Sequence, residues 1–347
     1  MARTLLLGTE RYALPILRPL AAALERRGEP ARWCVPDALA PALRANEPRV
    51  AGVRGVSEFD PELVLCATNE VPPSFPGLKV QLFHGFSVDK RSRERGHFRV
   101  RGLFDLYCTQ GPDTTAPFEA LAARLGHFRV AQTGWPKLDP LFSDGNEAAA
   151  GLRGDGSMPV IAFGSTFTPR LAAAPHVFDT IARLSREGPW RWLVTLHPKT
   201  DPALVARYRA LEGPRLTFVE TEDVLGLLRA ADVLVADTSS IVSEFALQLK
   251  PVVTFRNNAP KPHMIDVRSI DELEDAIARA LTRPPETMRA LEDFAARTHP
   301  YRDGRSSERV LDAAAAALAR GRAGLKRKPL NLWRRWQLKR EYARGFG

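Results

Sequence analysis

The stretch A-A-D-V-L-V-A-D-T-S-S-I-V-S-E-F-A-L-Q-L-K-P-V-V-T-F, from Ala230 to Phe255, decides the fold. Its segment Val233 to Ala236 is short, apolar and β-branched, which predicts a buried strand. Four apolar residues then follow at helical spacing, at Ile241, Val242, Phe245 and Leu249. Lys250 and Pro251 end this predicted helix, and Val252 to Phe255 reads as the next strand. The stretch is therefore expected to form a strand, a tight turn, a helix and a second strand.

The turn of this stretch consists of Asp237, Thr238, Ser239 and Ser240, which are residue types favoured at helix N-termini. Backbone N–H groups without partners and the positive end of the helix dipole favour phosphate at such a terminus. Two roles fit the turn: capping of the helix, or binding of a phosphate group.

The rest of the chain repeats this alternation of strands and helices. Before residue 143, strands are expected at 5–8, 32–35, 63–67, 80–83, 104–109 and 128–131, with helices at 15–27 and 114–125. After residue 159, further strands are expected at 160–163, 192–196 and 216–219, with helices at 176–186, 201–209, 221–229, 269–281, 285–297 and 306–320. Such alternation predicts a parallel, doubly wound sheet in each half.

A polar segment rich in glycine separates the two halves. Ser143 to Pro159 contains four glycines and little apolar sequence, which is typical of a domain boundary. We therefore expect an α/β protein with domains over residues 1–145 and 158–320, facing each other across a cleft. No G-x-G-x-x-G pattern follows Gly8, so the dinucleotide-binding fingerprint is absent.

Composition narrows the class of protein. The 347 residues are 44% hydrophobic and 26% charged, as in ordinary globular proteins. The sequence has no apolar run long enough to span a membrane, and its N-terminus lacks a signal-peptide pattern. Cys34, Cys66 and Cys108 lie in or beside apolar runs, so we expect buried thiols in a reducing compartment.

Small and polar residues follow four of the predicted strands. They are His84-Gly85 after 80–83, Gly164-Ser165-Thr166 after 160–163, His197-Pro198-Lys199 after 192–196, and Asp237 to Ser240 after 233–236. Ligands of open α/β sheets bind outside the carboxyl ends of the strands. These four segments are therefore the expected functional site.

Transfer of a phosphate-bearing group from a nucleotide donor to a hydroxyl fits these residues. One histidine can accept the hydroxyl proton, because its ordinary pKa is close to neutral, and a second can hold or protonate the leaving phosphate. Hydroxyls and helix N–H groups can stabilise the phosphate oxygens. Because Asp237 stands alone at its strand end, we expect no metal requirement.

At these residues the sequence resembles the CDP-glycerol glycerophosphotransferases of teichoic-acid and capsule synthesis. Q-L-F-H-G (81–85), with Asp105-Leu-Tyr downstream, resembles their Q-x-W-H-G, and T-G-W-P-K-L-D-P-L-F (133–142) resembles T-G-Y-P-R-x-D-x-L-F. L-H-P-K (196–199) is similar to R-x-H-P, and D-T-S-S (237–240) with Glu244 is similar to T-D-Y-S-S with a later acidic residue. D-G-R-S-S-E-R-V (303–310) resembles a segment near the C-terminus of these enzymes.

The resemblance implies a GT-B fold of two Rossmann-like domains, a CDP-linked polyol donor and two catalytic histidines, His84 and His197. It makes 1–145 the acceptor-side domain and 158–320 the nucleotide-donor domain, with no cofactor besides the donor substrate. The expected donor contacts are Gly85, Phe86, Ser87, Lys137, Ser165, Thr166, Thr195, Asp237, Thr238, Ser239, Ser240 and Glu244.

The donor site departs from the family pattern at several positions. Lys137 stands in place of the usual arginine, Thr195 in place of the arginine before the histidine, and Glu244 in place of aspartate. F-G-S-T-F-T (163–168) replaces A-P-T-W-R, so that an expected arginine is missing or shifted to Arg170. Ribitol, or another nucleotide-linked group, is therefore an alternative to glycerol.

The C-terminal segment carries most of the net charge. Residues 321–347 contain nine Lys and Arg and one acidic residue, which gives +8 of the total of +10. The basic residues are interleaved with Leu332, Trp333, Trp336, Leu338, Tyr342 and Phe346. We expect a basic helical tail that contacts an anionic membrane surface, the alternative being that its tryptophans dock onto the domains. Deletion of residues 331–347 is expected to leave the fold intact.

The function predicted first is transfer of a polyol phosphate, most simply glycerol phosphate, to a hydroxyl of a cell-envelope glycan or lipid-linked acceptor, with release of CMP. The expected location is cytoplasmic, on the inner face of the cell membrane, without nucleic acid as a partner. The alternatives are a GT-B glycosyltransferase or epimerase that uses a UDP-sugar, and a catalytically inactive scaffold. The arginine-rich run at 90–101 is either a solvated loop or a grip for a polyanionic acceptor.

Overall fold

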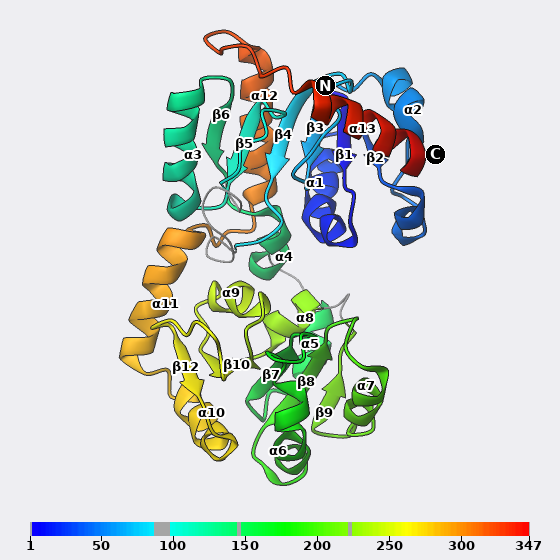
Figure 1. Cartoon of the computed structure of the whole chain (residues 1–347). Coiled ribbons are helices and arrows are strands. Elements are labelled where there is room, and N and C mark those ends of the chain that lie inside the picture. Colours follow the sequence, from blue (N-terminus) through cyan, green and yellow to red (C-terminus); the bar gives the residue numbers. More distant parts are fainter. Residues whose placement is uncertain (1, 87–97, 144–146, 221–223, 347) are drawn as a thin grey trace. The chain divides into compact units, whose positions relative to one another are not determined.

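The computed structural model describes residues 2–86, 98–143, 147–220 and 224–346. The chain divides into unit 1, residues 1–139 and 297–347, and unit 2, residues 140–296. Each unit is built around a six-stranded parallel sheet with helices against it (Figure 1). The predicted pair of Rossmann-like, doubly wound α/β domains is therefore confirmed.

The sheet of unit 1 has its first strand inside the sheet rather than at an edge. Its order is β2 (Ala31–Cys34), β1 (Thr4–Leu7), β3 (Leu63–Cys66), β4 (Leu78–Leu82), β5 (Leu106–Thr109) and β6 (Arg129–Gln132). The main helices of the unit are α1 (Leu14–Arg26), α2 (Gly52–Phe59), α3 (Pro112–Leu125), α12 (Ser306–Arg320) and α13 (Leu332–Gly345). Burial on both faces explains why β3 and residues 5–7 of β1, inside the sheet, are continuous apolar runs.

The sheet of unit 2 repeats this pattern. Its order is β12 (Met264–Val267), β11 (Val252–Phe255), β10 (Val233–Ala236), β7 (Val160–Ser165), β8 (Arg191–Leu196) and β9 (Leu216–Phe218). Its helices are α5 (Glu147–Arg153), α6 (Ala174–Glu187), α7 (Pro202–Arg209), α8 (Val224–Ala230), α9 (Ile241–Ala246), α10 (Leu273–Leu281) and α11 (Pro285–Thr298). The last residues of α11 belong to unit 1, and the short α4 (Asp139–Phe142) begins in unit 1. The strand that opens the decisive stretch, β10, lies between β7 and β11 and is fully buried.

The helix of the decisive stretch is shorter than predicted. Both strands have the predicted bounds, but α9 ends at Ala246. Leu249 then adopts a left-handed backbone conformation with φ 55°, which is incompatible with a continuing helix. The chain can therefore turn sharply into β11 at Pro251.

The unit boundaries differ from the predicted domain boundaries. The first segment of unit 1 ends at Asp139, and the polar segment 143–159 contains α5. Residues 297–320, which the sequence placed in the second domain, belong to unit 1, as does the tail. Four elements were not predicted: α2, α4, α5 and β12. In α2, Gly52 and Gly55 weaken the helical pattern.

Buried polar contacts explain why the chain returns to unit 1. The Asp139 carboxylate accepts hydrogen bonds from the Ser306 N–H (2.8 Å) and from both the N–H (2.7 Å) and the hydroxyl (2.6 Å) of Ser307, at the start of α12. The His299 Nε2 accepts the Trp135 N–H at 2.9 Å, and burial lowers the pKa of His299 to about 4. The motifs at 133–142 and 303–310 therefore contact each other and hold unit 1 together.

The C-terminal helix is an integral part of unit 1. Leu338, Tyr342 and Phe346 are buried in the same core cluster as Leu5 and Cys66. Deleting the helix would expose this core, so the expectation that residues 331–347 can be removed without loss of the fold is wrong. No helix in the described part of the chain is long and apolar enough to cross a membrane.

The three cysteines are free and buried, as predicted. Burial raises the pKa of the Cys34 and Cys108 thiols to about 12, so neither forms a thiolate near neutral pH.

Candidate functional site

The predicted donor residues of unit 2 lie at the carboxyl ends of three adjacent strands. The backbone register pairs Gly164 of β7 with Ala236 of β10 on one side and with Thr195 of β8 on the other. The segments after these strands therefore leave the sheet side by side. The Thr195 hydroxyl is buried there and has no hydrogen-bond partner among the described residues.

Asp237 organises this edge of the sheet. Its buried carboxylate accepts the Ser165 hydroxyl at 2.6 Å, the Thr166 N–H at 3.0 Å and the Ala173 N–H at 2.9 Å. The Ser165 hydroxyl in turn accepts the Ala174 N–H at 3.1 Å. Burial raises the pKa of the Asp237 carboxyl, and these hydrogen bonds oppose that rise. The side chains of Asp237 and Ser165 therefore fix the loop after β7. They also accept hydrogen bonds from the backbone N–H groups at the start of α6.

The turn after β10 does not cap its helix with a side chain. Ser240 is the N-cap residue of α9 but makes no side-chain capping hydrogen bond, which contradicts the first of the two roles considered for the turn, capping of the helix. The Thr238 hydroxyl accepts the Asn258 N–H at 3.1 Å. Ser240 is exposed and Ser239 half-buried, whereas Glu244 is buried on α9. The serine hydroxyls therefore lie closer to solvent than Asp237 does.

His197 follows β8 with its ring held by two neighbours. Its Nδ1 accepts the Lys199 N–H at 3.1 Å, so the neutral ring carries its proton on Nε2. The centre of the Phe167 ring lies 4.3 Å away, and the Lys199 Nζ lies 5.6 Å from the same ring. Burial, together with the Lys199 charge, lowers the pKa of His197 below 6.5. Neutral His197 can therefore donate a hydrogen bond from Nε2.

His84 follows β4 in unit 1. Its ring is exposed and lies 5.2 Å from that of Tyr12 between centroids. Burial of part of the ring, with a smaller contribution from Arg101, lowers its pKa below 6.5. A neutral imidazole at a solvent-accessible strand end can accept a proton.

The residues after His84 gather with the predicted donor contact Lys137. The Gly85 carbonyl accepts the Gln110 side-chain amide at 3.2 Å. The Phe86 ring packs edge-on against that of Trp135 at 4.8 Å, and the Lys137 Nζ lies 5.2 Å from the Trp135 ring. Trp135 itself donates from its indole to the Phe83 carbonyl at 2.6 Å. The motifs at 81–85 and 133–142 therefore lie in one cluster, in which sequence reasoning missed Trp135 and Gln110.

Some of the predicted residues lie outside the described part of the chain. They are Ser87 and, in the arginine-rich run, Lys90, Arg91, Arg93 and Arg95. Of the same run, Arg99 is exposed, and the Arg101 Nε lies 3.2 Å from the Glu70 carboxylate.

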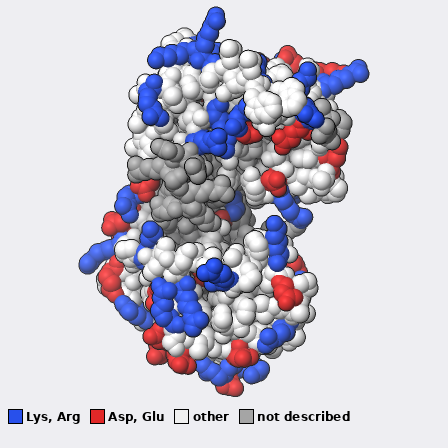
Figure 2. All heavy atoms as spheres, viewed as in Figure 1, with Lys and Arg blue, Asp and Glu red and all other residues white. Residues whose placement is uncertain are grey.

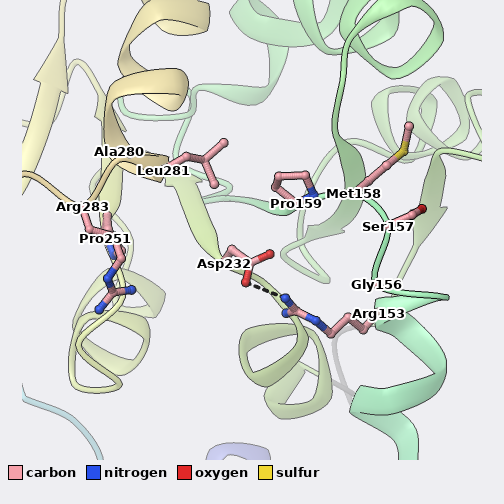
Figure 3. A pocket seen from close by; sticks show the side chains of 10 residues that line it. All are labelled: Arg153, Gly156, Ser157, Met158, Pro159, Asp232, Pro251, Ala280, Leu281 and Arg283. Atoms are coloured by element: carbon pink, nitrogen blue, oxygen red, sulfur yellow. Dashed lines mark hydrogen bonds and ion pairs between the residues drawn. The ribbon is translucent and has the colours of Figure 1, made fainter.

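A cavity in unit 2 lies away from these residues. Its volume is about 320 Å³, and its walls include the residues before β7, β10 and β11, at the amino ends of the strands (Figure 3). The Asp232 carboxylate that faces it accepts from the Arg153 guanidinium at 2.9 Å. The cavity is therefore at the opposite edge of the sheet from the predicted donor residues.

Metal ligands are not assembled in the described segments. Within 2–86, 98–143, 147–220 and 224–346, no group of three or more His, Cys, Asp or Glu side chains is placed to hold a metal ion.

Comparison with known proteins relates the chain to two kinds of enzyme. The family model described as UDP-N-acetylglucosamine 2-epimerase matches residues 121–315. Two teichoic acid ribitol-phosphate polymerases of Staphylococcus aureus, TarK and TarL, are each 24% identical over 225 residues, or 57% of this chain. The match covers 43% of TarK and 39% of TarL, so the chain spans less than half the length of these curated relatives.

Solved structures of both kinds share the fold. The wall teichoic acid polymerase TagF superposes with a TM-score of 0.67 at 14% identity, covering 91% of this chain and 88% of that chain. A putative UDP-N-acetylglucosamine 2-epimerase from Listeria monocytogenes gives a TM-score of 0.60 at 15% identity, covering 92% and 97%. The matches to teichoic acid polymerases confirm the resemblance found in the motifs. Because its model covers more than half of the sequence, the chain belongs to the UDP-N-acetylglucosamine 2-epimerase family.

Proposed function

We propose that the protein transfers a polyol phosphate from a CDP-linked donor to a hydroxyl group and releases CMP. The observation that carries the proposal is the pair of histidines at strand ends, each with its ring against an aromatic neighbour: His84 against Tyr12 and His197 against Phe167. The sequence match with two ribitol-phosphate polymerases supports the same reaction class and makes ribitol phosphate as good a transferred group as glycerol phosphate.

The two histidines have different roles in this proposal. His84 accepts the proton of the acceptor hydroxyl, because its lowered pKa leaves the ring neutral at pH 7. The hydroxyl oxygen then attacks the phosphorus of the polyol phosphate, and the bond to the CMP oxygen breaks. His197 donates from Nε2 to the leaving CMP phosphate, a direction that the Nδ1 contact with Lys199 favours.

The donor contacts divide into residues that touch phosphate and residues that hold the loops. The Asp237 and Ser165 side chains already bind each other and the backbone, so we assign them to loop support. Donor contacts are proposed for Gly85, Phe86, Ser87, Lys137, Thr166, Thr195, Thr238, Ser239, Ser240 and Glu244. The unsatisfied hydroxyl of Thr195 supports a polar ligand at this edge, because a buried hydroxyl without a partner is costly.

The reaction in this proposal uses no metal and no cofactor besides the donor substrate. Lys137, His197 and backbone N–H groups would balance the phosphate charge instead. The acceptor would be a cell-envelope glycan or a lipid-linked glycan.

The proposal includes an anionic membrane surface as a partner through residues 321–347, and a peripheral place on the inner face of the cell membrane. The net charge of +8 in this segment supports it.

The second candidate is an epimerase, or a glycosyltransferase, that acts on a UDP-sugar. The family model over residues 121–315 favours it, because that model describes a UDP-N-acetylglucosamine 2-epimerase. An inactive scaffold is the third candidate, and the organised histidine sites argue against it.

Product analysis separates these candidates. With CDP-glycerol or CDP-ribitol and a polyol-phosphate primer, we expect release of CMP together with a new phosphodiester, measured by chromatography and mass spectrometry. Incubation with UDP-N-acetylglucosamine, measured by sugar analysis, is expected to give neither UDP nor an epimer. Epimerisation or UDP release without CMP release would favour the second candidate instead, and no product from either donor would favour the scaffold.

A further inference from the structure

Helix α13 presents two apolar faces. Leu338, Tyr342 and Phe346 are buried on unit 1, with 2 to 4% of each side chain exposed. At its N-terminal end Leu332 and Trp333 are each 69% exposed and Trp336 is 47% exposed, and Leu330, just before the helix, is also 69% exposed. These four residues, here called the exposed patch, are four of the six large apolar side chains that the described part of the chain exposes. The other two are far from them in the sequence, at Tyr12 and Phe167.

The two faces are separated around the helix axis. At 3.6 residues per turn, Trp336 and Leu338 differ by roughly 200°. The rings of Trp333 and Trp336 stack on each other with centroids 5.1 Å apart, so the exposed tryptophans form one continuous surface. Phe346, another apolar residue of the tail, belongs to the buried side.

Exposed basic residues surround the patch. Arg335, Lys339 and Arg340 are exposed on α13, and the Arg340 guanidinium lies 4.5 Å from the Trp336 ring centre. Figure 2 shows lysine and arginine side chains beside uncharged surface where Figure 1 places α13. Aromatic side chains flanked by Lys and Arg fit the headgroup layer of an anionic bilayer, where the rings lie among the headgroups and the charges meet acidic lipids.

The segment that precedes α13 is bound to unit 1 by hydrogen bonds and ion pairs. Both Arg322 and Lys328 bind the Asp105 carboxylate at 2.8 Å, so part of the positive charge of residues 321–347 is neutralised within unit 1. The Asn331 side-chain amide donates to the Arg101 carbonyl at 2.9 Å, and Arg334 pairs with Glu70. These contacts hold the N-terminal end of the helix on unit 1, and the buried Leu338, Tyr342 and Phe346 hold the rest. The exposed face of the helix therefore has a fixed orientation on unit 1.

We propose that the exposed patch inserts into the headgroup layer of an anionic lipid bilayer while α13 stays packed on unit 1. This inference rests on the membrane partner included in the proposed function and assigns the contact to Leu330, Leu332, Trp333 and Trp336. Because α13 is fixed on the unit that carries His84, the bound membrane would present acceptors that are themselves attached to lipid. A lipid-linked glycan is therefore the acceptor class that this geometry favours.

Vesicle binding by the full chain tests the inference without any use of the transfer reaction. We expect the protein to bind vesicles of phosphatidylcholine mixed with phosphatidylglycerol, and brominated lipid to quench its tryptophan fluorescence. Trp333→Ser with Trp336→Ser should weaken binding by roughly tenfold or more and remove the quenching, because the other four tryptophans are buried. Arg335→Gln with Lys339→Gln should weaken binding by roughly fivefold for each charge removed.

Matched controls keep the test specific. Arg124→Gln with Arg320→Gln removes the same charge from exposed positions on α3 and α12 and should leave vesicle binding unchanged. Thermal unfolding of every variant should match that of the wild type, since none of the replaced side chains is buried. Wild-type protein that does not bind the anionic vesicles, or binding that survives both serine substitutions, would overturn the inference. So would a dimer that dissociates in the serine variant, because the patch would then be covered by a second copy.

Discussion

His84→Ala and His197→Ala are each expected to lower the turnover of a CDP-linked donor by about two orders of magnitude or more. The first change removes the proposed proton acceptor, and the second removes the Nε2 donor to the leaving phosphate. Initial rates of CMP release, at saturating donor, measure both effects. Because neither ring is part of a buried core, the melting temperature should change little.

The pH dependence of turnover adds an independent test of His84. Its base form is the neutral ring, and its pKa lies below 6.5. Protonation on acidification therefore removes activity only below about pH 6.5, and the acid limb of the profile should lie there and disappear in His84→Ala. His176→Ala is the matched control, since His176 is an exposed histidine of unit 2 outside the proposed site. Full activity in both site variants would show that the histidines are wrongly assigned.

Asp237→Ala is expected to lower the free energy of unfolding of the protein by about 2–4 kcal/mol. The substitution leaves the Ser165 hydroxyl and the Thr166 and Ala173 N–H groups without their buried acceptor. The loop after β7 would lose its support, so turnover should fall together with stability. Urea unfolding followed by circular dichroism measures the loss.

Graded variants show whether the loss arises from these hydrogen bonds. Ser165→Ala removes one of the partners and should cost about 1–2 kcal/mol. Asp275→Ala, at an exposed position of α10, should change stability by no more than about 0.5 kcal/mol. A cost for Asp237→Ala as small as that of the surface variant would contradict the loop-support role.

Local sequence was sufficient to predict most strands and the helices that connect them. Val233 to Ala236 and Val252 to Phe255 have the predicted bounds, because a buried parallel strand must be a short apolar run. Ser306 to Arg320 is also helical as predicted. The alternation of strands and helices then implied a parallel sheet, in which the polar residues after β7, β8 and β10 lie at the same edge. The register of these three strands confirms this.

Long-range contacts account for what could not be predicted. The chain returns to unit 1 after residue 296 because Asp139 and Trp135 bind groups more than 160 residues away, and no local pattern encodes such pairing. The expectation that residues 331–347 can be deleted without loss of the fold was wrong for the same reason, because the contacts of the tail are also with residues far away in the sequence. Its alternating basic and apolar residues do not reveal that Leu338, Tyr342 and Phe346 complete a core.

Within the site, sequence could identify residue types but not their partners. Asp237 and the serines after it look equivalent in the sequence. In the structure Asp237 is buried and accepts hydrogen bonds from three groups, whereas Ser240 is exposed. Residue preferences at helix N-termini suggested that this turn caps α9, but they do not determine whether a side chain makes the hydrogen bond. Trp135 was missed because an apolar aromatic next to glycine reads as core, and its contacts with Phe86 and Lys137 appear only in three dimensions.

Thermal unfolding with a panel of nucleotide-linked donors tests the central claim most directly. A ligand that binds only the folded state stabilises it by RT ln(1 + [L]/Kd), so a donor at about 100 times its Kd contributes about 2.7 kcal/mol and raises the melting temperature. We predict that CDP-glycerol or CDP-ribitol raises the melting temperature by several degrees and that UDP-N-acetylglucosamine does not. A rise with UDP-N-acetylglucosamine and none with either CDP-linked polyol would contradict the proposed function.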